Sequence, residues 1–211
     1  RSARRSPATV FDRNYRSLGE PGAPAPPQFP MGTAISRRFS QFLLRKHRRL
    51  LIIGLDGAGK TTILFRMYAK KTVQTQPTEG YNVQTFQLGG LVMNVWDVGG
   101  QDELRRFWRH YYTGTQGIVF VIDSSDTDRL KAAKTELTEA IADPQLNNAA
   151  ILVLANKQDQ PEAIPPEDLS KSMGLPTLLK GRTWRIQGSV GTTADGLIDG
   201  FKWLGSNMRT I

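Results

Sequence analysis

The residue spacing with the clearest chemical meaning in this 211-residue chain is the run GLDGAGKT at 54–61. It fits the pattern G-x-x-x-x-G-K-[ST] and follows a short apolar segment. Glycines in such a loop let backbone N–H groups point at phosphate oxygens, and the helix that follows adds its dipole. The pattern predicts a phosphate loop in which Lys60 reaches the β and γ phosphates and the Thr61 hydroxyl binds Mg²⁺. The predicted nucleotide contacts of this loop are Gly54, Asp56, Gly57, Ala58, Gly59, Lys60, Thr61 and Thr62.

A second candidate motif, DVGG at 97–100, follows an apolar run that ends at Trp96. A carboxylate at Asp97 would hold the water shell of Mg²⁺, and the N–H of Gly100 would reach a γ-phosphate. The pattern D-x-x-G is weak alone, and its weight comes from its place about forty residues after the phosphate loop.

The third motif, NKQD at 156–159, follows the apolar run 151–155. The carboxylate of Asp159 can accept hydrogen bonds from guanine N1–H and N2–H₂, a donor pair that adenine lacks. Asn156 and the aliphatic stem of Lys157 would position and cover the base. The motif therefore predicts selection of guanine, and it argues against ATPases and nucleotide kinases that share the phosphate loop.

These motifs must be positioned by strands that alternate with helices. Glycine-flanked and apolar runs predict strands at 50–54, 82–88, 91–96, 117–122, 150–155 and 184–187. Periodic segments predict helices at 59–70, 101–112, 127–142 and 194–207. This order predicts an α/β fold, a six-stranded, mostly parallel sheet with helices on both faces. Such sheets bind ligands at the carboxyl ends of their strands, where all three motifs fall.

Composition narrows the class of protein. The chain has no cysteine, which excludes disulfides, zinc–thiolate sites, thiol nucleophiles, palmitoylation and prenylation. Residues 1–50 hold 11 Lys and Arg against 2 Asp and Glu, which leaves 17 of each for the rest of the chain. The formal charge of +9 therefore belongs to an N-terminal arm, and we expect no nucleic-acid partner for the folded part.

The N-terminal arm divides into two parts. Half of the 12 prolines lie in residues 1–30, which predicts a disordered leader. Whether this leader belongs to the native protein stays open from the sequence. Met31 then opens the run MGTAIS, which fits the acceptor pattern for N-myristoylation at Gly32. Acylation requires a free N-terminal glycine, so this prediction holds only if residues 1–31 are absent or removed.

Residues 31–48 have the pattern of an amphipathic, basic, membrane-binding helix. Ile35, Phe39, Phe42 and Leu43 lie at i, i+4, i+7 and i+8, with six Lys and Arg residues between 37 and 49 beside them. Such a helix is the second signal that a single acyl chain needs for stable membrane binding. The alternative is a helix that packs its apolar face on the nucleotide-binding domain, predicted for 49–211.

Together these motifs resemble those of small GTPases, and their detail resembles the ADP-ribosylation factor family of Arf and Arf-like proteins. The resemblance covers about 32–211 and includes GLDGAGKTT (54–62), PTEGYNV (77–83), WDVGGQD (96–102), RHYY (109–112), QGIVFVIDSSD (116–126), LANKQDQP (154–161) and DGL (195–197). It implies a Ras-like P-loop GTPase domain with GTP or GDP and Mg²⁺ as ligands. The activity it implies is a molecular switch that hydrolyses GTP and recruits effectors to membranes in vesicle trafficking.

The resemblance also assigns residues outside the three motifs. It implies that Thr78 binds Mg²⁺ and the γ-phosphate in the GTP state, and that Gln101 orients the attacking water. Val190 and Gly191 would contribute backbone contacts to the guanine. Three aromatic residues would form an effector surface, although aromatic packing in the core is the simpler explanation for them: Tyr81, Trp96 and Tyr111.

The resemblance further implies partners and a location. No arginine lies between Lys71 and Thr78 to assist in cis, so we expect slow hydrolysis that needs an activating protein, and an exchange factor to release GDP. Effector or coat proteins and a membrane surface complete the expected partners. The expected location is cytoplasmic with reversible membrane association, at the Golgi by resemblance only. Glu79 departs from the family, which usually has an apolar residue there, and predicts a different choice of effector or exchange factor.

Three other functions stay open from the sequence. The first is an Arf-like GTP-dependent binding module with negligible turnover or a role away from the Golgi. The second is a P-loop enzyme of another class, such as a nucleotide kinase. The third is a soluble GTPase without an acyl chain.

Overall fold

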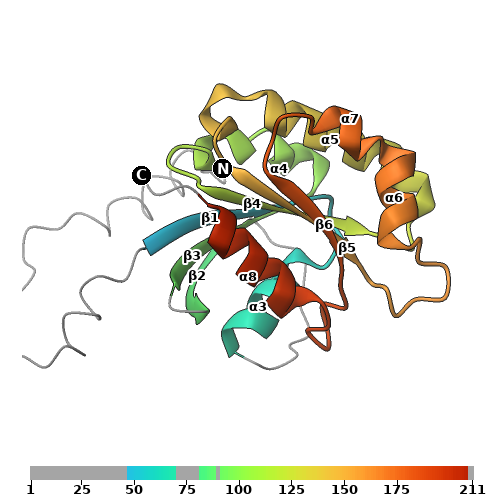
Figure 1. Cartoon of the computed structure of the whole chain (residues 1–211), viewed down its shortest axis with the longest axis horizontal. Helices are drawn as coiled ribbons and strands as arrows, with labels where there is room; N and C mark the ends of the chain where they lie inside the picture. The colour runs from blue at the N-terminus through green and yellow to red at the C-terminus, as the bar shows by residue number, and fades with distance from the viewer. Residues whose placement is uncertain (1–46, 70–80, 89–90, 209–211) are drawn as a thin grey trace, which may run out of the picture. The chain divides into compact units, whose positions relative to one another are not determined.

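The computed structural model describes residues 47–69, 81–88 and 91–208 (Figure 1). Six strands of these residues form one sheet in the order β2-β3-β1-β4-β5-β6. The pair β2 and β3 is antiparallel, and the other neighbours are parallel, so the predicted six-stranded, mostly parallel sheet is confirmed. The strands are β1 (His47–Ile53), β2 (Tyr81–Leu88), β3 (Leu91–Val98), β4 (Gly117–Asp123), β5 (Ala150–Asn156) and β6 (Trp184–Gly188).

Helices cover both faces of the sheet. Figure 1 shows α3 and α8 on one face, and α5, α6 and α7 on the other. The α-helices are α3 (Lys60–Ala69), α4 (Asp102–Arg105), α5 (Leu130–Ala142), α6 (Pro166–Met173), α7 (Leu175–Leu178) and α8 (Leu197–Asn207), and the short 3₁₀ turns are η2 (Trp108–Tyr111), η3 (Thr127–Arg129) and η4 (Pro144–Leu146). None of the helices in the described part of the chain has the length and apolar character needed to cross a membrane.

The central strands are buried on both sides. Leu50 and Ile52 of β1 pack in the cluster that contains Phe201 of α8, whereas Leu51 and Ile53 pack in the cluster that contains Leu137 of α5. Side chains alternate between the faces of a strand, so a parallel strand covered twice must be apolar throughout. These strands form a rigid base, and the loops at their carboxyl ends are the parts left to bind ligands.

The start of the domain differs from the prediction. Strand β1 begins at His47, three residues before the expected strand, so the predicted boundary between residues 48 and 49 falls inside it. Arg48 pairs with Met93 of β3 and is 6% exposed, and Arg49 pairs with Asn94. Both arginines were predicted as the basic flank of a membrane-binding helix. Their long aliphatic stems pack within the sheet, which is why charged residues can extend this strand.

The predicted helix at 101–112 is wrong as a continuous element. It is divided into α4 and the 3₁₀ turn η2, with Arg106 and Phe107 between them. In a 3₁₀ turn residues i and i+3 lie on the same side, and here that side buries Trp108 and Tyr111. The indole N–H of Trp108 donates to the carbonyl of Gly99 at 3.0 Å. Packing of the two aromatic rings therefore decides the geometry of this segment.

Three other helix predictions need correction. Helices α6 and α7 were not predicted, although Pro165-Pro166 marks the start of α6 as proline often does. The predicted helix at 127–142 begins with the turn η3 before α5. Helix α8 begins at Leu197, later than expected, because Ala194 and Gly196 have left-handed backbone angles, with φ of 78° and 72°.

Candidate nucleotide-binding site

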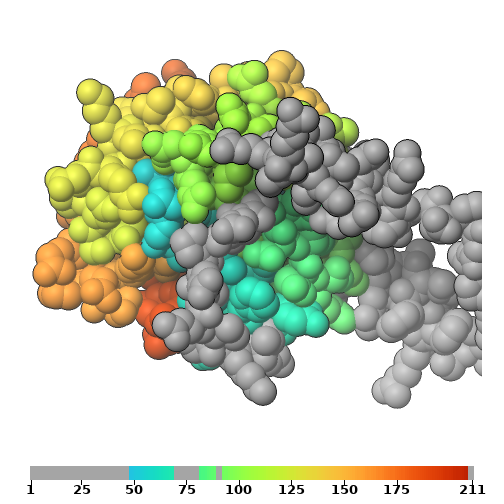
Figure 2. Space-filling view, turned by 180° about the vertical axis from the view of Figure 1, so that it is seen from behind, coloured from blue at the N-terminus to red at the C-terminus, as the bar shows by residue number. Residues whose placement is uncertain are grey.

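The three sequence motifs meet at the carboxyl ends of β1, β3 and β5. Strand β1 lies between β3 and β4, where the strand order changes direction, and the phosphate loop follows it. In Figure 2 the cyan surface of the β1–α3 segment is bordered by the light green surface of the segment after β3 and the yellow surface of the α5 region. The fold therefore brings together motifs that are about forty and about one hundred residues apart.

The phosphate loop, residues 54–61, is shaped by close contacts that only glycine allows. Gly54 has φ of 144°, and a Cβ at this residue would lie 2.2 Å from the carbonyl oxygen of Val121. Gly59 has φ of 94°, and its Cβ would lie 2.5 Å from the side-chain nitrogen of Asn156. Helix α3 begins at Lys60, and the first N–H groups of a helix have no partner within it. The loop has the form expected for binding an anion at a helix N-terminus.

Lys60 is held inside this loop. Its ammonium donates to the carbonyl of Leu55 at 2.9 Å, and the residue is 6% exposed. Burial lowers the pKa of Lys60 to about 8, although the carboxylates of Asp97 and Asp56 act in the opposite direction. Gly100 approaches so closely that a Cβ there would lie 2.4 Å from the Lys60 nitrogen. The lysine and the glycine predicted to contact the γ-phosphate are therefore adjacent.

Asp97 and Thr61 form the pair of oxygen ligands that was predicted for Mg²⁺. Asp97 lies fully buried near the carboxyl end of β3. The Thr61 hydroxyl donates to its Oδ2 at 2.7 Å. The amide of Asn82 also approaches the same oxygen, at 3.4 Å. Hydroxyl and carboxylate oxygens are the ligands that Mg²⁺ prefers, so the residues present fit that ion.

Asn156 connects the phosphate loop to the loop after β6. It is 2% exposed, and its amide nitrogen donates to the carbonyl of Ala58 at 2.8 Å. Its amide oxygen accepts from the N–H of Gly191 at 3.0 Å and from the hydroxyl of Ser189 at 3.2 Å. The role of Asn156 is therefore to bind three segments of the site together, one of which carries the predicted base contacts.

Lys157, predicted to cover the base, has a left-handed backbone, which is rare for a residue other than glycine. Its φ is 64°, and its ammonium forms an ion pair with Asp123 at 2.6 Å, at the end of β4. Burial alone would raise the pKa of Asp123, but hydrogen bonds from Lys157 and Ser125 outweigh it and lower the pKa. The pair keeps the lysine stem extended along the loop, and Asp123 was not predicted as a site residue.

The other predicted base contacts lie nearby. Asp159 is exposed, and its Oδ2 accepts from Gln160 at 3.1 Å. Val190 donates its N–H to the carbonyl of Asp195 at 3.0 Å, and the N–H of Gly191 is used by Asn156. Both N–H groups of the predicted guanine-contacting pair are thus bonded within the protein. Their direct contact with a base stays a prediction.

Gln101 lies at the start of α4 with its side chain exposed. Its φ of −65° and ψ of 147° are those of a residue that precedes a helix, and its side chain makes no capping hydrogen bond. The carbonyl of Gln101 instead accepts from the N–H of Leu104 at 2.9 Å. The backbone of this residue is ordered by the helix while its amide faces solvent, as orienting a water molecule would require.

The three predicted effector-surface aromatics form one cluster, although they come from β2, β3 and η2. The ring centroids of Tyr81 and Trp96 are 5.4 Å apart, those of Tyr81 and Tyr111 5.5 Å, and those of Trp96 and Tyr111 5.7 Å. The guanidinium of Arg49 lies 4.4 Å from the centre of the Trp96 ring. Tyr111 is a buried member of the core cluster, and Tyr81 and Trp96 are half-buried and pack against it, so the contacts agree with packing in the core. A role in effector binding stays a prediction.

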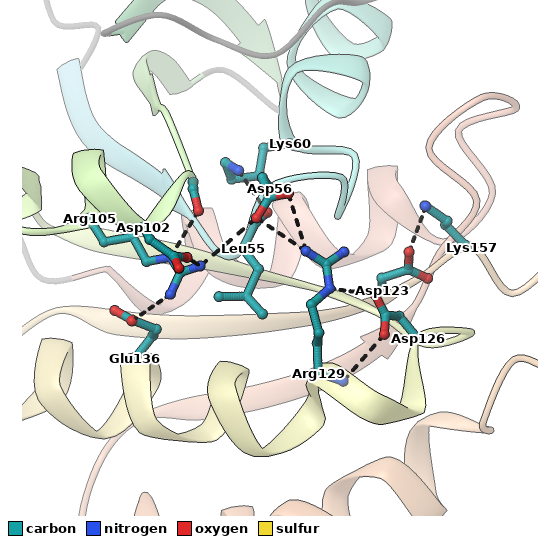
Figure 3. A network of polar contacts seen from close by, with 11 residues as sticks. Leu55, Asp56, Lys60, Asp102, Arg105, Asp123, Asp126, Arg129, Glu136 and Lys157 are labelled. Atoms are coloured by element: carbon teal, nitrogen blue, oxygen red, sulfur yellow. Dashed lines mark hydrogen bonds and ion pairs between the residues drawn. The ribbon is translucent and has the colours of Figure 1, made fainter.

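Figure 3 shows a network of ion pairs beside the phosphate loop that sequence reasoning missed. Arg129 donates to both oxygens of Asp56, at 3.1 and 3.2 Å, and to Asp126 at 2.6 Å. Arg105 approaches Asp56 from the other side and bonds Glu136 of α5. No spacing rule connects residues 31 or 73 positions apart. The only sequence signal was their proximity to DVGGQD and to IDSSD.

Several predictions lie outside the described residues. These are the leader at 1–30, the helix at 31–46 with Gly32, the switch residues Thr78 and Glu79, and the Gly89-Gly90 tip of the hairpin.

Comparisons with known proteins agree with this geometry. The model of the ADP-ribosylation factor family matches residues 35–208. Among solved structures, the chain is similar to the Arl6 BBS3 small GTPase from Trypanosoma brucei with the bound nucleotide analogue GppNp. That match has 32% identity and a TM-score of 0.71, and covers 76% of this chain and 96% of that one. With its phosphate loop, its Thr61–Asp97 pair and its Asn156 connection, this chain belongs to the ADP-ribosylation factor family of small GTPases and has their Ras-like P-loop fold.

Proposed function

We propose that this protein is a GTP-dependent switch that selects guanine, binds Mg²⁺, hydrolyses GTP slowly and recruits effectors to membranes. The observation that carries the proposal is the set of hydrogen bonds made by Asn156. They join the phosphate loop at Ala58 to the loop after β6 at Ser189 and Gly191. The predicted phosphate and base contacts are thereby held at a fixed distance from each other, which supports one nucleotide as the ligand of both.

Selection of guanine rests on Asp159. Its carboxylate accepts two hydrogen bonds from guanine, whereas Asn at this position would offer a donor that suits xanthine instead. Protein stripped of nucleotide should take up GTP and GDP but not ATP. The Asp159→Asn variant should bind GTP at least roughly a hundredfold more weakly and gain affinity for xanthosine triphosphate. Equal uptake of ATP and GTP would rule out the proposed switch and favour another class of P-loop enzyme.

The Mg²⁺ ion would be held by the hydroxyl of Thr61, by Asp97 through water and by Thr78. Bound there, the ion supplies neutralisation of phosphate charge. The chain's own contribution is a carboxylate with no exposure, oriented by the Thr61 hydroxyl at 2.7 Å. In wild type, EDTA should speed the release of GDP because it removes Mg²⁺. In Asp97→Asn the release rate should be the same with and without EDTA, and release of fluorescent GDP measures both rates.

Hydrolysis would depend on Gln101, whose exposed amide can accept and donate to a water molecule at the same time. The slow rate follows from the sequence between Lys71 and Thr78, which has no arginine to assist in cis. An activating protein would supply that charge, and an exchange factor would release GDP from the enclosed site. Single-turnover hydrolysis should fall in Gln101→Leu, and an unchanged rate would favour a binding module without turnover.

The switch would be read at the surface formed by Tyr81, Trp96 and Tyr111. Two of these residues lie on the antiparallel pair β2 and β3, whose register in this structure places Val83 opposite Trp96. A slip of this pair by two residues against β1 keeps every side chain on its face, since strands alternate with period two. Effector or coat proteins that bind only one register would therefore report the bound nucleotide.

Membrane attachment is proposed from the sequence at 31–48. An acyl chain on Gly32 together with the apolar and basic face of that segment would supply two membrane signals. The protein would then be cytoplasmic with reversible membrane association, and vesicle trafficking at the Golgi is the role that the family resemblance suggests. Co-sedimentation with anionic liposomes of a chain that begins at Met31, with and without the acyl chain, tests this part separately. Equal binding of both forms would favour a GTPase that does not use acylation.

A further inference from the structure

We infer that Arg105 is a positioning residue for GTP hydrolysis, because its guanidinium holds the peptide group that carries Gln101. The inference rests on the proposed function, in which Gln101 orients the attacking water. It adds a residue that neither the motifs nor the comparisons assign.

The Arg105 side chain is largely enclosed within a mostly exposed segment. Its neighbours Gln101, Glu103, Arg106 and Phe107 are all exposed, whereas only 14% of the Arg105 side chain is accessible. Figure 3 shows the side chain turned toward the phosphate loop and α5. A long cationic side chain in a surface segment normally extends into water, so its enclosure here indicates specific contacts.

The contacts of the Arg105 guanidinium reach three parts of the chain. Its Nε donates to the carbonyl of Gly100 at 2.9 Å, and Nη1 donates to Glu136 Oε1 of α5 at 2.9 Å. Its Nη2 contacts Asp102 and lies 3.9 Å from Asp56 of the phosphate loop. Because the guanidinium is planar and rigid, these bonds fix one orientation of the group.

The carbonyl of Gly100 is the point on which this contact acts. It accepts from Arg105 Nε and also from the N–H of Asp56, at 3.1 Å. A peptide group is planar, so fixing that carbonyl also fixes the nitrogen of Gln101 in the same plane. The backbone of Gln101 is thereby placed relative to the phosphate loop, while its side chain stays free to meet water.

Glu136 connects Arg105, and with it the segment after Gly100, to helix α5. It lies on α5 beside Leu137, a residue with no exposure in the core, so the helix is a rigid reference for the segment. The Glu136 side chain is 20% exposed, and its ion pair with Arg105 is less screened than a fully exposed pair. Arg105 therefore transmits the position of α5 and of the phosphate loop to the peptide before Gln101.

The test compares single-turnover hydrolysis of bound GTP, without an activator, in the full-length protein and in variants of Arg105. Lysine keeps the charge but has a single nitrogen in place of the planar fork whose Nε and Nη1 reach Gly100 and Glu136 separately, so Arg105→Lys should be about fivefold slower. Arg105→Gln should be about tenfold slower or more. Arg106→Lys is the matched control, because Arg106 is exposed and lies over the Phe107 ring at 4.9 Å; it should hydrolyse at the wild-type rate.

A second set of measurements distinguishes a positioning role of Arg105 from a general loss of stability or of nucleotide binding. The rate of GDP release and the melting temperature of the Arg105 variants should stay within about twofold and a few degrees of wild type. Glu136→Gln should slow hydrolysis about threefold, and should add little in combination with Arg105→Gln, since both act on one contact.

The outcomes are distinct. Wild-type hydrolysis by Arg105→Lys would overturn the inference, because charge alone would then suffice. A fall in hydrolysis matched by faster GDP release would overturn it as well, since the variant would have disturbed the whole site. Wild-type protein that shows no hydrolysis would overturn the proposed function and this inference together, whereas normal hydrolysis that is insensitive to Arg105 would overturn the inference alone.

Discussion

The side of the site proposed to bind the base and the side proposed to position water are held by different kinds of contact. Asn156, on the base side, is a neutral amide with 2% exposure and three hydrogen bonds to two other segments, the phosphate loop and the loop after β6. On the other side, the segment after Gly100 is held chiefly by Arg105, whose partners Asp102 and Glu136 are partly or largely open to solvent. One side is therefore fastened inside the protein and the other at its surface.

This difference has a physical consequence for a switch. Breaking a buried hydrogen-bond network leaves polar groups without partners and costs about 1–3 kcal/mol for each group. An ion pair near the surface contributes only about 0–1 kcal/mol, because water replaces it readily. We therefore expect the contacts around Asn156 to stay the same in both nucleotide states. The segment with Gln101 can be moved by a partner whose charged groups compete for Arg105.

The largest expected effect is on the base side. Asn156→Ala leaves the carbonyl of Ala58 and the N–H of Gly191 without their partner, and we expect a loss of about 3 kcal/mol in GDP binding, or roughly a hundredfold. Titration with fluorescent GDP measures this. The control is Asn147→Ala in an exposed turn, which should bind GDP normally. Similar losses in both variants would contradict the role of the buried network.

The next largest effect is the pH dependence of GDP binding, which tests Lys60 in the phosphate loop between the two sides. Lys60 has a pKa of about 8 in the folded protein, lowered by burial, so above pH 8 the nucleotide-free protein holds it neutral. Phosphate binding favours the ammonium, so GDP binding takes up a proton and weakens about fivefold between pH 8 and pH 9. Calorimetry in buffers of different ionisation enthalpy should detect this proton. Affinity that does not change from pH 7 to 9 would contradict it.

The same pKa predicts the direction of a stability change. The unfolded chain has the ordinary lysine value of 10.5, so it binds more protons than the folded, nucleotide-free protein between pH 8 and 10.5. The contribution of Lys60 to the free energy of unfolding therefore rises with pH in that window and is smallest below pH 8. Comparing Lys60→Met with wild type by urea unfolding isolates this contribution, because the variant lacks the titrating group.

A smaller effect is expected from the ion pair at the end of β4. Asp123→Asn removes the charge that holds the Lys157 ammonium at 2.6 Å, and should weaken GDP binding about fivefold. Added salt should reduce the difference between variant and wild type, because it screens the pair in the wild type. A salt-independent loss would point to a structural change in place of an electrostatic one.

The smallest effect is expected at Arg129. Its guanidinium is 40% exposed and shares Asp56 with Arg105, so Arg129→Gln should change GDP binding by about twofold at most. Its hydrolysis rate should equal that of wild type, in contrast with the Arg105 variants. A large fall in hydrolysis would mean that Asp56, and not the Gly100 carbonyl, is the point through which the network acts.

Prediction from sequence succeeded where a local pattern has one structural solution. The phosphate loop, the strands before each motif and the mostly parallel character of the sheet follow from spacing and apolar runs, whereas the strand order came from the structure. It failed at 101–112, where the pattern suited one helix but the packing of Trp108 and Tyr111 required a break. It also failed at the start of β1, because the charged residues Arg48 and Arg49 did not match the apolar pattern expected of a buried strand.

The functional residues divide in the same way. Lys60, Thr61, Asp97 and Asn156 could be named in advance, because their types and spacing are tied to phosphate, magnesium and guanine chemistry. Arg105, Glu136 and Asp123 could not, because an arginine or a carboxylate has no preferred spacing to its partner and dozens of surface candidates exist.

The amino-acid order alone determined the family, the class of ligand and the segments that form the site, since glycines, apolar runs and short motifs act over neighbouring residues. Tertiary structure decided which charges meet, which loop Asn156 binds and how the peptide before Gln101 is held. Arg105 and Gly100 are 5 positions apart, but the contacts that place them against the rest of the site join residues 31 to 98 positions apart. Their partners are chosen by the way the sheet and helices pack, which no short pattern encodes.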